Sequence, residues 1–175
     1  VLNVFHWSIP ALFLLVAVFN AVVAVYIYTL VPEFLIRFIA WMLIHSVYRV
    51  RKQGADKLPP EGAGPALLIA NHVSFVDAIV LMAISPRPIR FVMDHQIFKV
   101  PVLSFIFKHA KAIPIASAKV NPEMLAQAYD SVDEALAQGE LVCIFPEGRI
   151  TDTGQLYPFK SGVSQILARR PVPVY

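Results

Sequence analysis

The residue pair best suited to acid–base chemistry is His72 and Asp77, with four residues between them. His72 follows a short apolar run, residues 65–70, and Asp77 falls in the first turn of the helical pattern that comes next. A turn between them can fold the carboxylate back onto the imidazole. There it would fix the tautomer and stabilise the imidazolium that forms when the ring accepts a proton. The spacing therefore predicts a general base with an orienting carboxylate.

The same segment also fits a purely structural interpretation. Ser74 and Asp77 have the spacing of a capping box, with Ser74 as the N-cap and Asp77 at N3 of the following helix. His72 would then only bond a loop carbonyl. Spacing by itself leaves both interpretations open.

A second polar cluster, Glu147-Gly148-Arg149, follows the apolar run at residues 141–145. Gly148 permits a tight turn with exposed backbone N–H groups. Arg149 offers a planar fork of donors that suits phosphate. Because functional groups of α/β sheets gather beyond the carboxyl ends of the strands, both clusters are expected at one site. An ordinary turn with a surface ion pair is the alternative.

Together the two clusters resemble the motifs of the glycerolipid acyltransferase family, of the bacterial lysophosphatidate acyltransferase type. Asn71-His72-x4-Asp77 matches the family's NHxxxxD (HX4D) motif, and Phe145-Pro146-Glu147-Gly148-Arg149 is similar to its FPEGxR or FPEGTR motif. Val172-Pro173-Val174 matches its apolar V-P-V strand. The resemblance covers about residues 50–175.

The resemblance implies transfer of a fatty acyl group from an acyl thioester to the free hydroxyl of a lysophospholipid. It makes His72 and Asp77 the catalytic residues and assigns Glu147, Gly148 and Arg149 to binding of the acyl acceptor. The donor would be acyl-CoA or acyl carrier protein, with no tightly bound cofactor.

Residues 112–119 depart from the family pattern, in which an apolar strand ends in Asp-Arg or Asn-Arg. Here the arginine is absent and Lys119 is the nearest cation. This form resembles the 2-acylglycerophosphoethanolamine acyltransferase branch, whose domain can be fused to a lysophospholipid transporter or an acyl-carrier-protein ligase. A lysophosphatidylethanolamine acceptor is therefore expected, with lysophosphatidate as the alternative. Lys119 and Lys160 are candidates for further phosphate contacts, and solvated surface charge is the alternative for both.

Two other function classes fit the same residues. A transacylase or hydrolase could use the same histidine, and a lipid-binding module could carry a degenerate site. No Ser or Cys stands in a G-x-S-x-G nucleophile elbow, which favours direct transfer without an acyl-enzyme. The acids and histidines form no recognisable metal-ligand pattern, so no metal is expected.

Composition divides the chain into an apolar front and a charged remainder. The hydrophobic share is 57%, against roughly 45–50% in soluble domains. Residues 1–48 contain Arg37 and Glu33, and all other Lys, Arg, Asp and Glu residues follow. Residues 11–30 carry no charge and, at about 1.5 Å per residue, can span a hydrocarbon core of about 30 Å. Residues 34–48 are short for a span, which favours a re-entrant or interfacial helix packed on the first.

Charge also predicts the partners and the location of the chain. A net charge of +3 without a basic stripe and interleaved aromatics excludes a nucleic-acid groove and suits a lipid bilayer. Arg49, Arg51, Lys52 and Lys57 directly follow the apolar front. Because positive charge marks the cytoplasmic side, we expect a bacterial inner-membrane protein with its catalytic part in the cytoplasm.

After residue 54, short apolar runs alternate with helical patterns. The strands are expected at residues 65–70, 89–93, 112–115, 141–145 and 172–175, and the helices at residues 76–84, 98–111, 122–138 and 161–169. The alternation predicts an α/β fold, a mostly parallel sheet flanked by helices, behind an N-terminal hydrophobic anchor. The expected domains are residues 1–48, the anchor, and residues 49–175, an acyltransferase domain truncated at its C-terminus.

Overall fold

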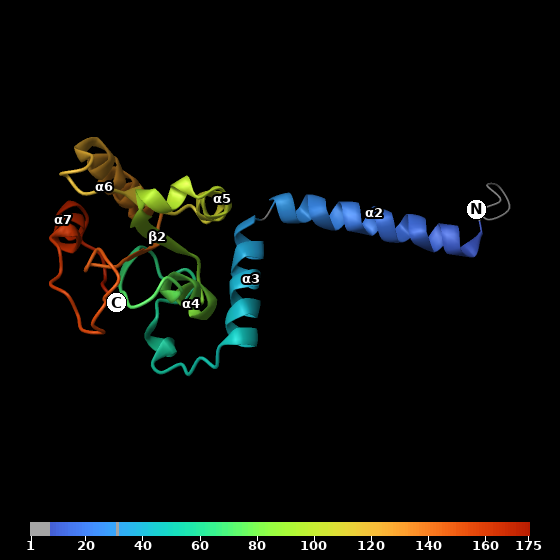
Figure 1. Cartoon of the computed structure of the whole chain (residues 1–175), viewed down its shortest axis with the longest axis horizontal. Helices are drawn as coiled ribbons and strands as arrows, with labels where there is room; N and C mark the ends of the chain where they lie inside the picture. Colours follow the sequence, from blue (N-terminus) through green and yellow to red (C-terminus); the bar gives the residue numbers. More distant parts are fainter. Residues whose placement is uncertain (1–7, 31) are drawn as a thin grey trace. The chain divides into compact units, whose positions relative to one another are not determined.

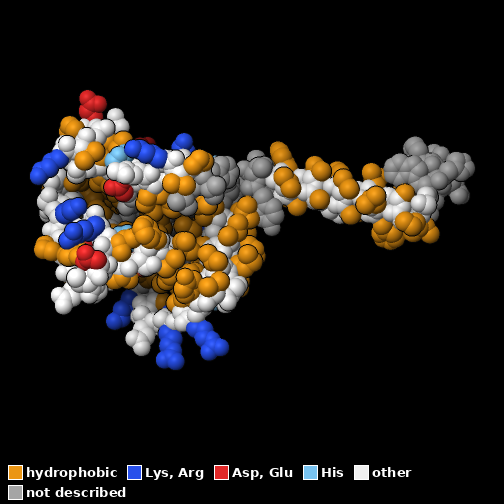
Figure 2. Space-filling model, viewed as in Figure 1, with side chains coloured by type: hydrophobic (Ala, Val, Ile, Leu, Met, Phe, Trp, Pro, Cys, Tyr) orange, Lys and Arg blue, Asp and Glu red, His pale blue; other side chains and the backbone are white. Residues whose placement is uncertain are grey.

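The computed structural model describes residues 8–30 and 32–175, and the chain divides into two compact units, Val1–Leu35 and Ile36–Tyr175 (Figure 1). The first unit contains helix α2 (Ile9–Leu30). Ser8 caps this helix, since its hydroxyl accepts the Ala11 N–H at 3.4 Å. Ile9–Ile27 is long and apolar enough to cross a membrane, and Figure 2 shows hydrophobic side chains along α2. The sequence Val31-Pro32-Glu33 indicates a break between the two apolar segments, and Val31 lies outside the described residues.

The second unit is built on a four-stranded parallel sheet, as predicted. Its strands are β1 (Ala66–Ile69), β2 (Ile89–Asp94), β3 (Ile113–Ile115) and β4 (Leu141–Ile144), in the order β1-β4-β2-β3. Residues 173–175 extend the sheet beyond β1, where the predicted last strand begins. Val174 forms a parallel bridge with Leu67, and the Leu67 N–H donates to the Pro173 carbonyl at 3.0 Å and the Ile69 N–H to the Tyr175 carbonyl at 2.9 Å. Strands β1 and β4 are therefore direct neighbours, although 71 residues separate their ends in the sequence.

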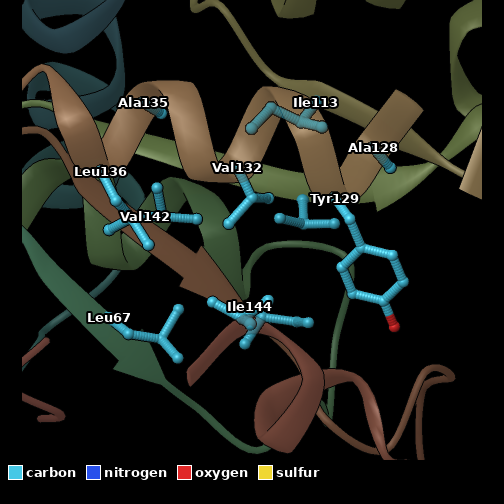
Figure 3. Packing of buried hydrophobic residues seen from close by; sticks show 11 residues of the cluster. Leu67, Ile113, Ala128, Tyr129, Val132, Ala135, Leu136, Val142 and Ile144 are labelled. Atoms are coloured by element: carbon cyan, nitrogen blue, oxygen red, sulfur yellow. The ribbon is translucent and has the colours of Figure 1, made fainter. Parts of the chain in front are cut away.

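Alternating residues of the strands bury opposite faces of the sheet, as the two-residue period of a strand requires. Leu67, Val142 and Ile144 pack against helices α6 (Pro122–Ala137) and α7 (Gly162–Arg169) (Figure 3). Leu68 and Cys143 belong to a second cluster on the other face, which also contains side chains of helices α4 (Asp77–Ile84) and α3 (Pro32–Val47). The sheet is thus a middle layer between helices.

Helix α3 packs on the globular unit through Ala40 and Ile44, and the expected packing of this helix on the first one stays a prediction. Ala40 and Ile44 are buried, and Ala40 belongs to the core cluster that also contains Ala78 of α4. The Arg37 guanidinium donates to the carbonyl of Ser85 at 3.1 Å. The buried side chains of α3, small Ala40 and branched Ile44, thus let this helix cover the sheet face beside α4. The predicted division at residues 48 and 49 is not tested by this packing.

The predicted helix at residues 98–111 is interrupted. A 3₁₀ helix, η2 (His95–Lys99), precedes helix α5 (Pro101–His109), because Pro101 lacks an N–H and starts a new helix at its first position. A further 3₁₀ turn, η1, covers Ala55–Lys57. The other predicted helices end within one or two residues of their observed bounds.

Candidate active site

The two polar clusters leave the carboxyl ends of adjacent strands. In the β1–β4 ladder Ile69 is the partner of Ile144, and the Ala70 N–H donates to the carbonyl of Ile144 at 3.3 Å. The chain then continues into His72 on one side and Glu147 on the other. Sheet topology, rather than proximity in sequence, brings the predicted site together.

His72 and Asp77 form the expected pair. The imidazole Nδ1 lies 3.0 Å from Oδ2 of Asp77, with side chains 21% and 18% exposed. An ionised carboxylate can only accept, so Nδ1 carries the proton and Nε2 keeps a lone pair. The geometry is that of an oriented base. Catalysis by the pair remains a prediction.

The same carboxylate oxygen also organises the turn. Oδ2 of Asp77 accepts the backbone N–H groups of Val73 at 2.8 Å and Ser74 at 2.9 Å. The capping box is only half formed, because the Ser74 hydroxyl accepts from Val76 at 3.3 Å, and Val76 is the N-cap. The structural and functional interpretations of Asp77 are therefore compatible, since one oxygen serves both.

Aromatic stacking on one face of the imidazole ring also holds it in place. The His72 and Phe145 rings lie 4.2 Å apart between centroids with an interplanar angle of 21°. Phe91 stands behind Phe145 at 6.4 Å and 12°. The Asp77 bond and this stack together restrict rotation of the imidazole, which preorganises Nε2.

Glu147 is buried and joins two loops. It is 2% exposed, and Oε1 accepts the His72 N–H while Oε2 accepts the Tyr157 N–H, both at 2.9 Å. These two hydrogen bonds, first that of Tyr157 and then that of His72, hold the pKa of Glu147 below its usual value. The Thr151 N–H donates to the His72 carbonyl at 2.8 Å, so the backbone of His72 is held on both sides. Both carboxylate oxygens therefore accept backbone donors and tie the two loops together, while the assignment of Glu147 to acceptor binding stays a prediction.

Gly148 has a positive φ of 65°, and a Cβ built there would overlap Nζ of Lys160. The Lys160 N–H donates to the carbonyl of Pro146 at 2.9 Å. The structure thus brings Lys160 onto the turn that carries Gly148. The Gly148 N–H donates to the carbonyl of Phe145 at 3.0 Å, so this group is occupied within the turn.

Arg149 is exposed, and its Cζ lies 3.8 Å from the centroid of the Tyr157 ring. Lys119 also is exposed, in the turn after the edge strand β3, and no hydrogen bond or ion pair links it to the other site residues among those described. The structure therefore brings together all the predicted site residues except Lys119.

No sequence pattern marked Tyr157, Thr151 or the stacking role of Phe145 as parts of the site. Tyr157 and Thr151 lie in the irregular segment between β4 and α7, where no periodicity marks a contact. Phe145 stood within a recognised motif, but a residue type does not reveal a ring stack. Within residues 8–30 and 32–175, no three His, Cys, Asp or Glu side chains are grouped to hold a metal ion.

Residues 49–175 match the model of the acyltransferase family, and the chain belongs to this family. It is 28% identical over 142 residues to the 1-acyl-sn-glycerol-3-phosphate acyltransferase BAT2, chloroplastic, of Brassica napus, which covers 81% of this chain and 40% of that protein. It is 26% identical over 140 residues to the 1-acyl-sn-glycerol-3-phosphate acyltransferase of Pseudomonas aeruginosa, which covers 79% of this chain and 52% of that protein.

The chain thus spans about half or less of the length of these relatives. The fold is also similar to the crystal structure of the 1-acyl-sn-glycerophosphate acyltransferase PlsC from Thermotoga maritima. The TM-score is 0.57 at 20% sequence identity, covering 70% of this chain and 46% of that one. This likeness supports the parallel sheet with its flanking helices.

Proposed function

We propose that the protein transfers a fatty acyl group from an acyl thioester to the free hydroxyl of a lysophospholipid. The observation that carries this proposal is the His72–Asp77 pair, bonded at 3.0 Å through Nδ1, beside the turn with Gly148 and Arg149. Nε2 is then the nitrogen left for the substrate. Membership of the acyltransferase family supports the same reaction class.

In this mechanism Nε2 of His72 accepts the proton of the acceptor hydroxyl. The hydroxyl oxygen attacks the thioester carbonyl, and the tetrahedral intermediate collapses with cleavage of the C–S bond. The imidazolium then protonates the departing thiolate, so the histidine returns to its neutral form. Asp77 stabilises the imidazolium throughout, and no acyl-enzyme is required.

The acceptor that the relatives favour is lysophosphatidate. The proteins from Brassica napus and Pseudomonas aeruginosa are both named 1-acyl-sn-glycerol-3-phosphate acyltransferases. This supports the alternative of the sequence analysis over its first expectation, lysophosphatidylethanolamine. The specific observation behind that first expectation is Lys119 in place of an arginine, so both acceptors belong in the test. Arg149 and Lys160 would bind the phosphate.

The deciding experiment uses membranes that carry the full-length protein, with wild type beside His72→Ala. Each receives a labelled acyl thioester, as acyl-CoA or acyl carrier protein, and either lysophosphatidate or lysophosphatidylethanolamine. We expect transfer to lysophosphatidate by wild type and a loss of about 10²–10⁴-fold in the variant, the usual contribution of a general base. His45→Gln, a change on the exposed side of α3, is the matched control.

Three results would contradict parts of this proposal. Retention of more than about a tenth of the activity by His72→Ala would remove His72 as the base. Acyl exchange between phospholipids without added thioester would indicate a transacylase. No transfer to either acceptor by folded wild type would indicate a lipid-binding module.

We also propose that the protein is held in a membrane by α2, with the globular unit on the cytoplasmic side. The hydropathy of Ile9–Ile27 and the basic residues after α3 support this location. Cys143 is the single cysteine, and its burial raises the pKa of the thiol to about 12, which keeps it unreactive. Lys57→Cys therefore gives one reactive thiol on the exposed surface.

In spheroplasts, we expect a membrane-impermeant maleimide to label Lys57→Cys after lysis and not before. The unsubstituted 175-residue chain, in which Cys143 is the single cysteine, is the control and should stay unlabelled in both cases. Labelling of intact spheroplasts would place the globular unit on the outer side.

A further inference from the structure

Tyr157 makes three contacts that link the site together. Its backbone N–H donates to Oε2 of Glu147 at 2.9 Å, its ring lies under the Arg149 guanidinium at 3.8 Å, and its hydroxyl donates to Oδ1 of Asp152. The side chain is partly buried in the irregular segment after β4. No sequence motif marks it.

Stacking on a ring face restricts a guanidinium without using its donors. The N–H groups lie in the plane of the guanidinium, so their edges stay free for a bidentate acceptor. In the part of the chain that the structure describes, the exposed Arg149 side chain forms no hydrogen bond or ion pair. It interacts with Asp152 only electrostatically, since the pKa of that carboxyl is lowered by the Tyr157 hydrogen bond and, to a smaller extent, by the charge of Arg149. The fork is therefore held in place while its donors remain open to an anion.

The ring of Tyr157 is itself fixed at both ends. Asp152 accepts from the hydroxyl at the outer end, and the backbone at the inner end is bonded to Glu147. The other oxygen of Glu147 holds the backbone of His72 at 2.9 Å. A continuous set of contacts thus relates the position of the Arg149 guanidinium to the position of the base.

We propose that Tyr157 is a positioning residue that holds Arg149 for the phosphate of the acyl acceptor. This inference rests on the proposed function, because it takes a phosphorylated lipid as the acceptor. It adds a residue that the motifs do not contain. It also explains why the motif arginine, on an exposed turn, keeps a defined orientation.

The test compares side chains at position 157 in the full-length protein. Tyr157→Leu removes the ring face, whereas Tyr157→Phe removes only the hydroxyl. We expect Tyr157→Leu to raise the KM for lysophosphatidate about two- to fivefold, the range of a cation–π contact at an exposed site, with kcat within about twofold. Tyr157→Phe should stay closer to the wild-type KM. Both keep the backbone N–H that Glu147 accepts.

Two controls separate positioning from loop stability. Leu156→Ala changes an exposed neighbour, 66% exposed, and should leave KM unchanged. In an Arg149→Ala background, Tyr157→Leu should have no further effect on KM, because its target is gone. Melting temperatures are recorded for every variant. Should Tyr157→Leu fail to fold, Tyr157→Gln provides the same comparison.

A binding measurement keeps this inference separate from the proposed reaction. Hexadecyl phosphate has no alcohol hydroxyl to acylate, and hexadecyl phosphocholine, whose phosphodiester is balanced by a quaternary ammonium, serves as the zwitterionic control in mixed micelles. Weaker binding of hexadecyl phosphate by Tyr157→Leu, about two- to fivefold, would support the inference even if wild type transferred no acyl group. An effect equal to that of Leu156→Ala, a fall in kcat alone, or an undiminished effect in Arg149→Ala would overturn it.

Discussion

At the scale of single residues, Asp77 joins three donors through one oxygen. Oδ2 accepts from Nδ1 of His72 and from the N–H groups of Val73 and Ser74. The two backbone hydrogen bonds fix the position of the Asp77 oxygen, and the hydrogen bond from Nδ1 then fixes the orientation of the His72 ring. The geometry of the base is thus set by the backbone turn and not by the side-chain pair alone.

Asp77→Asn should separate geometry from charge. The amide oxygen can accept the N–H groups of Val73 and Ser74 from the same position, so the turn should persist. The negative charge beside the imidazolium is lost, so we expect kcat to fall about 10²–10⁴-fold with little change in melting temperature. Initial rates of acyl transfer and thermal melts measure both. Asp130→Asn, which alters a surface pair with Arg169, should keep its activity; an Asp77→Asn rate within tenfold of wild type would contradict the assignment.

Glu147 predicts a dependence of stability on acid pH. Its pKa is lowered in the folded protein, so its contribution is complete above the ordinary Glu range, about 4.3, and is lost as the pH falls through the lowered value. In Glu147→Gln the amide N–H₂ would face a backbone N–H, a contact between two donors that leaves one of them without an acceptor. The melting temperature of this variant should therefore be lower at neutral pH. Its further decrease between about pH 5 and 3 should be shallower than in wild type.

Thermal melts of wild type and Glu147→Gln over this pH range provide the measurement. Glu134→Gln, on the exposed side of α6, is the control and should follow the wild-type curve. An equally steep acid decrease in Glu147→Gln would show that other carboxylates carry the effect.

At the scale of elements, the site is the meeting of two loops at one sheet edge. The loop after β1 carries His72, the proposed base, and the segment between β4 and α7 carries Gly148, Arg149 and Lys160. They are joined by the Glu147 carboxylate and by the Thr151–His72 backbone bond. Small changes in the turn of the second loop should therefore affect acceptor binding.

Gly148→Ala and Gly154→Ala form a matched pair for this turn. Both glycines have positive φ, 65° and 73°, so each alanine should cost about 1–2 kcal/mol of stability. A Cβ at Gly148 would overlap Lys160, whereas nothing lies within 4 Å of one at Gly154. We expect both variants to lose stability, and Gly148→Ala in addition to raise the acceptor KM. Equal KM values in the two variants would remove Lys160 from the acceptor site.

At the scale of the whole molecule, the apolar helix and the globular unit have different physical roles. The side chains of α2 from Ile9 to Ile27 are exposed or nearly so, whereas the unit Ile36–Tyr175 has its own core on both faces of the sheet. An exposed apolar helix of this length is stable in a bilayer and not in water. Attachment to a membrane and folding of the catalytic unit should therefore respond to different mutations.

Lysines at the centre of α2 should test membrane attachment. Val16→Lys with Phe19→Lys costs about 2.5–3.5 kcal/mol per residue at the middle of a bilayer, so the protein should move into the carbonate-extractable fraction. Ile9→Lys with Ile27→Lys places the same charges near the helix ends, where long side chains reach the interface, and should remain in the membrane. Equal extraction of both double variants would contradict a membrane-spanning α2.

The sequence by itself determined the type of most elements and predicted which residues are reactive. Strand and helix periods depend on neighbouring side chains, and the elements predicted from them agree with the structure apart from the break at Pro101. The contact between Asp77 and His72 is also local, because the two residues are five positions apart and one turn brings their side chains together. The other candidate site residues were predicted from motifs of a few residues.

The tertiary structure decided which distant residues meet. The order β1-β4-β2-β3 places Glu147 against His72, and leaves Lys119 beyond β2 at the far strand. The tertiary structure also packs α3 on the sheet and stacks the Tyr157 ring against the Arg149 guanidinium. These contacts depend on sheet order and on irregular backbone, and neither leaves a periodic signal in the chain, because hydrogen bonds between strands are formed by backbone groups that every sequence shares.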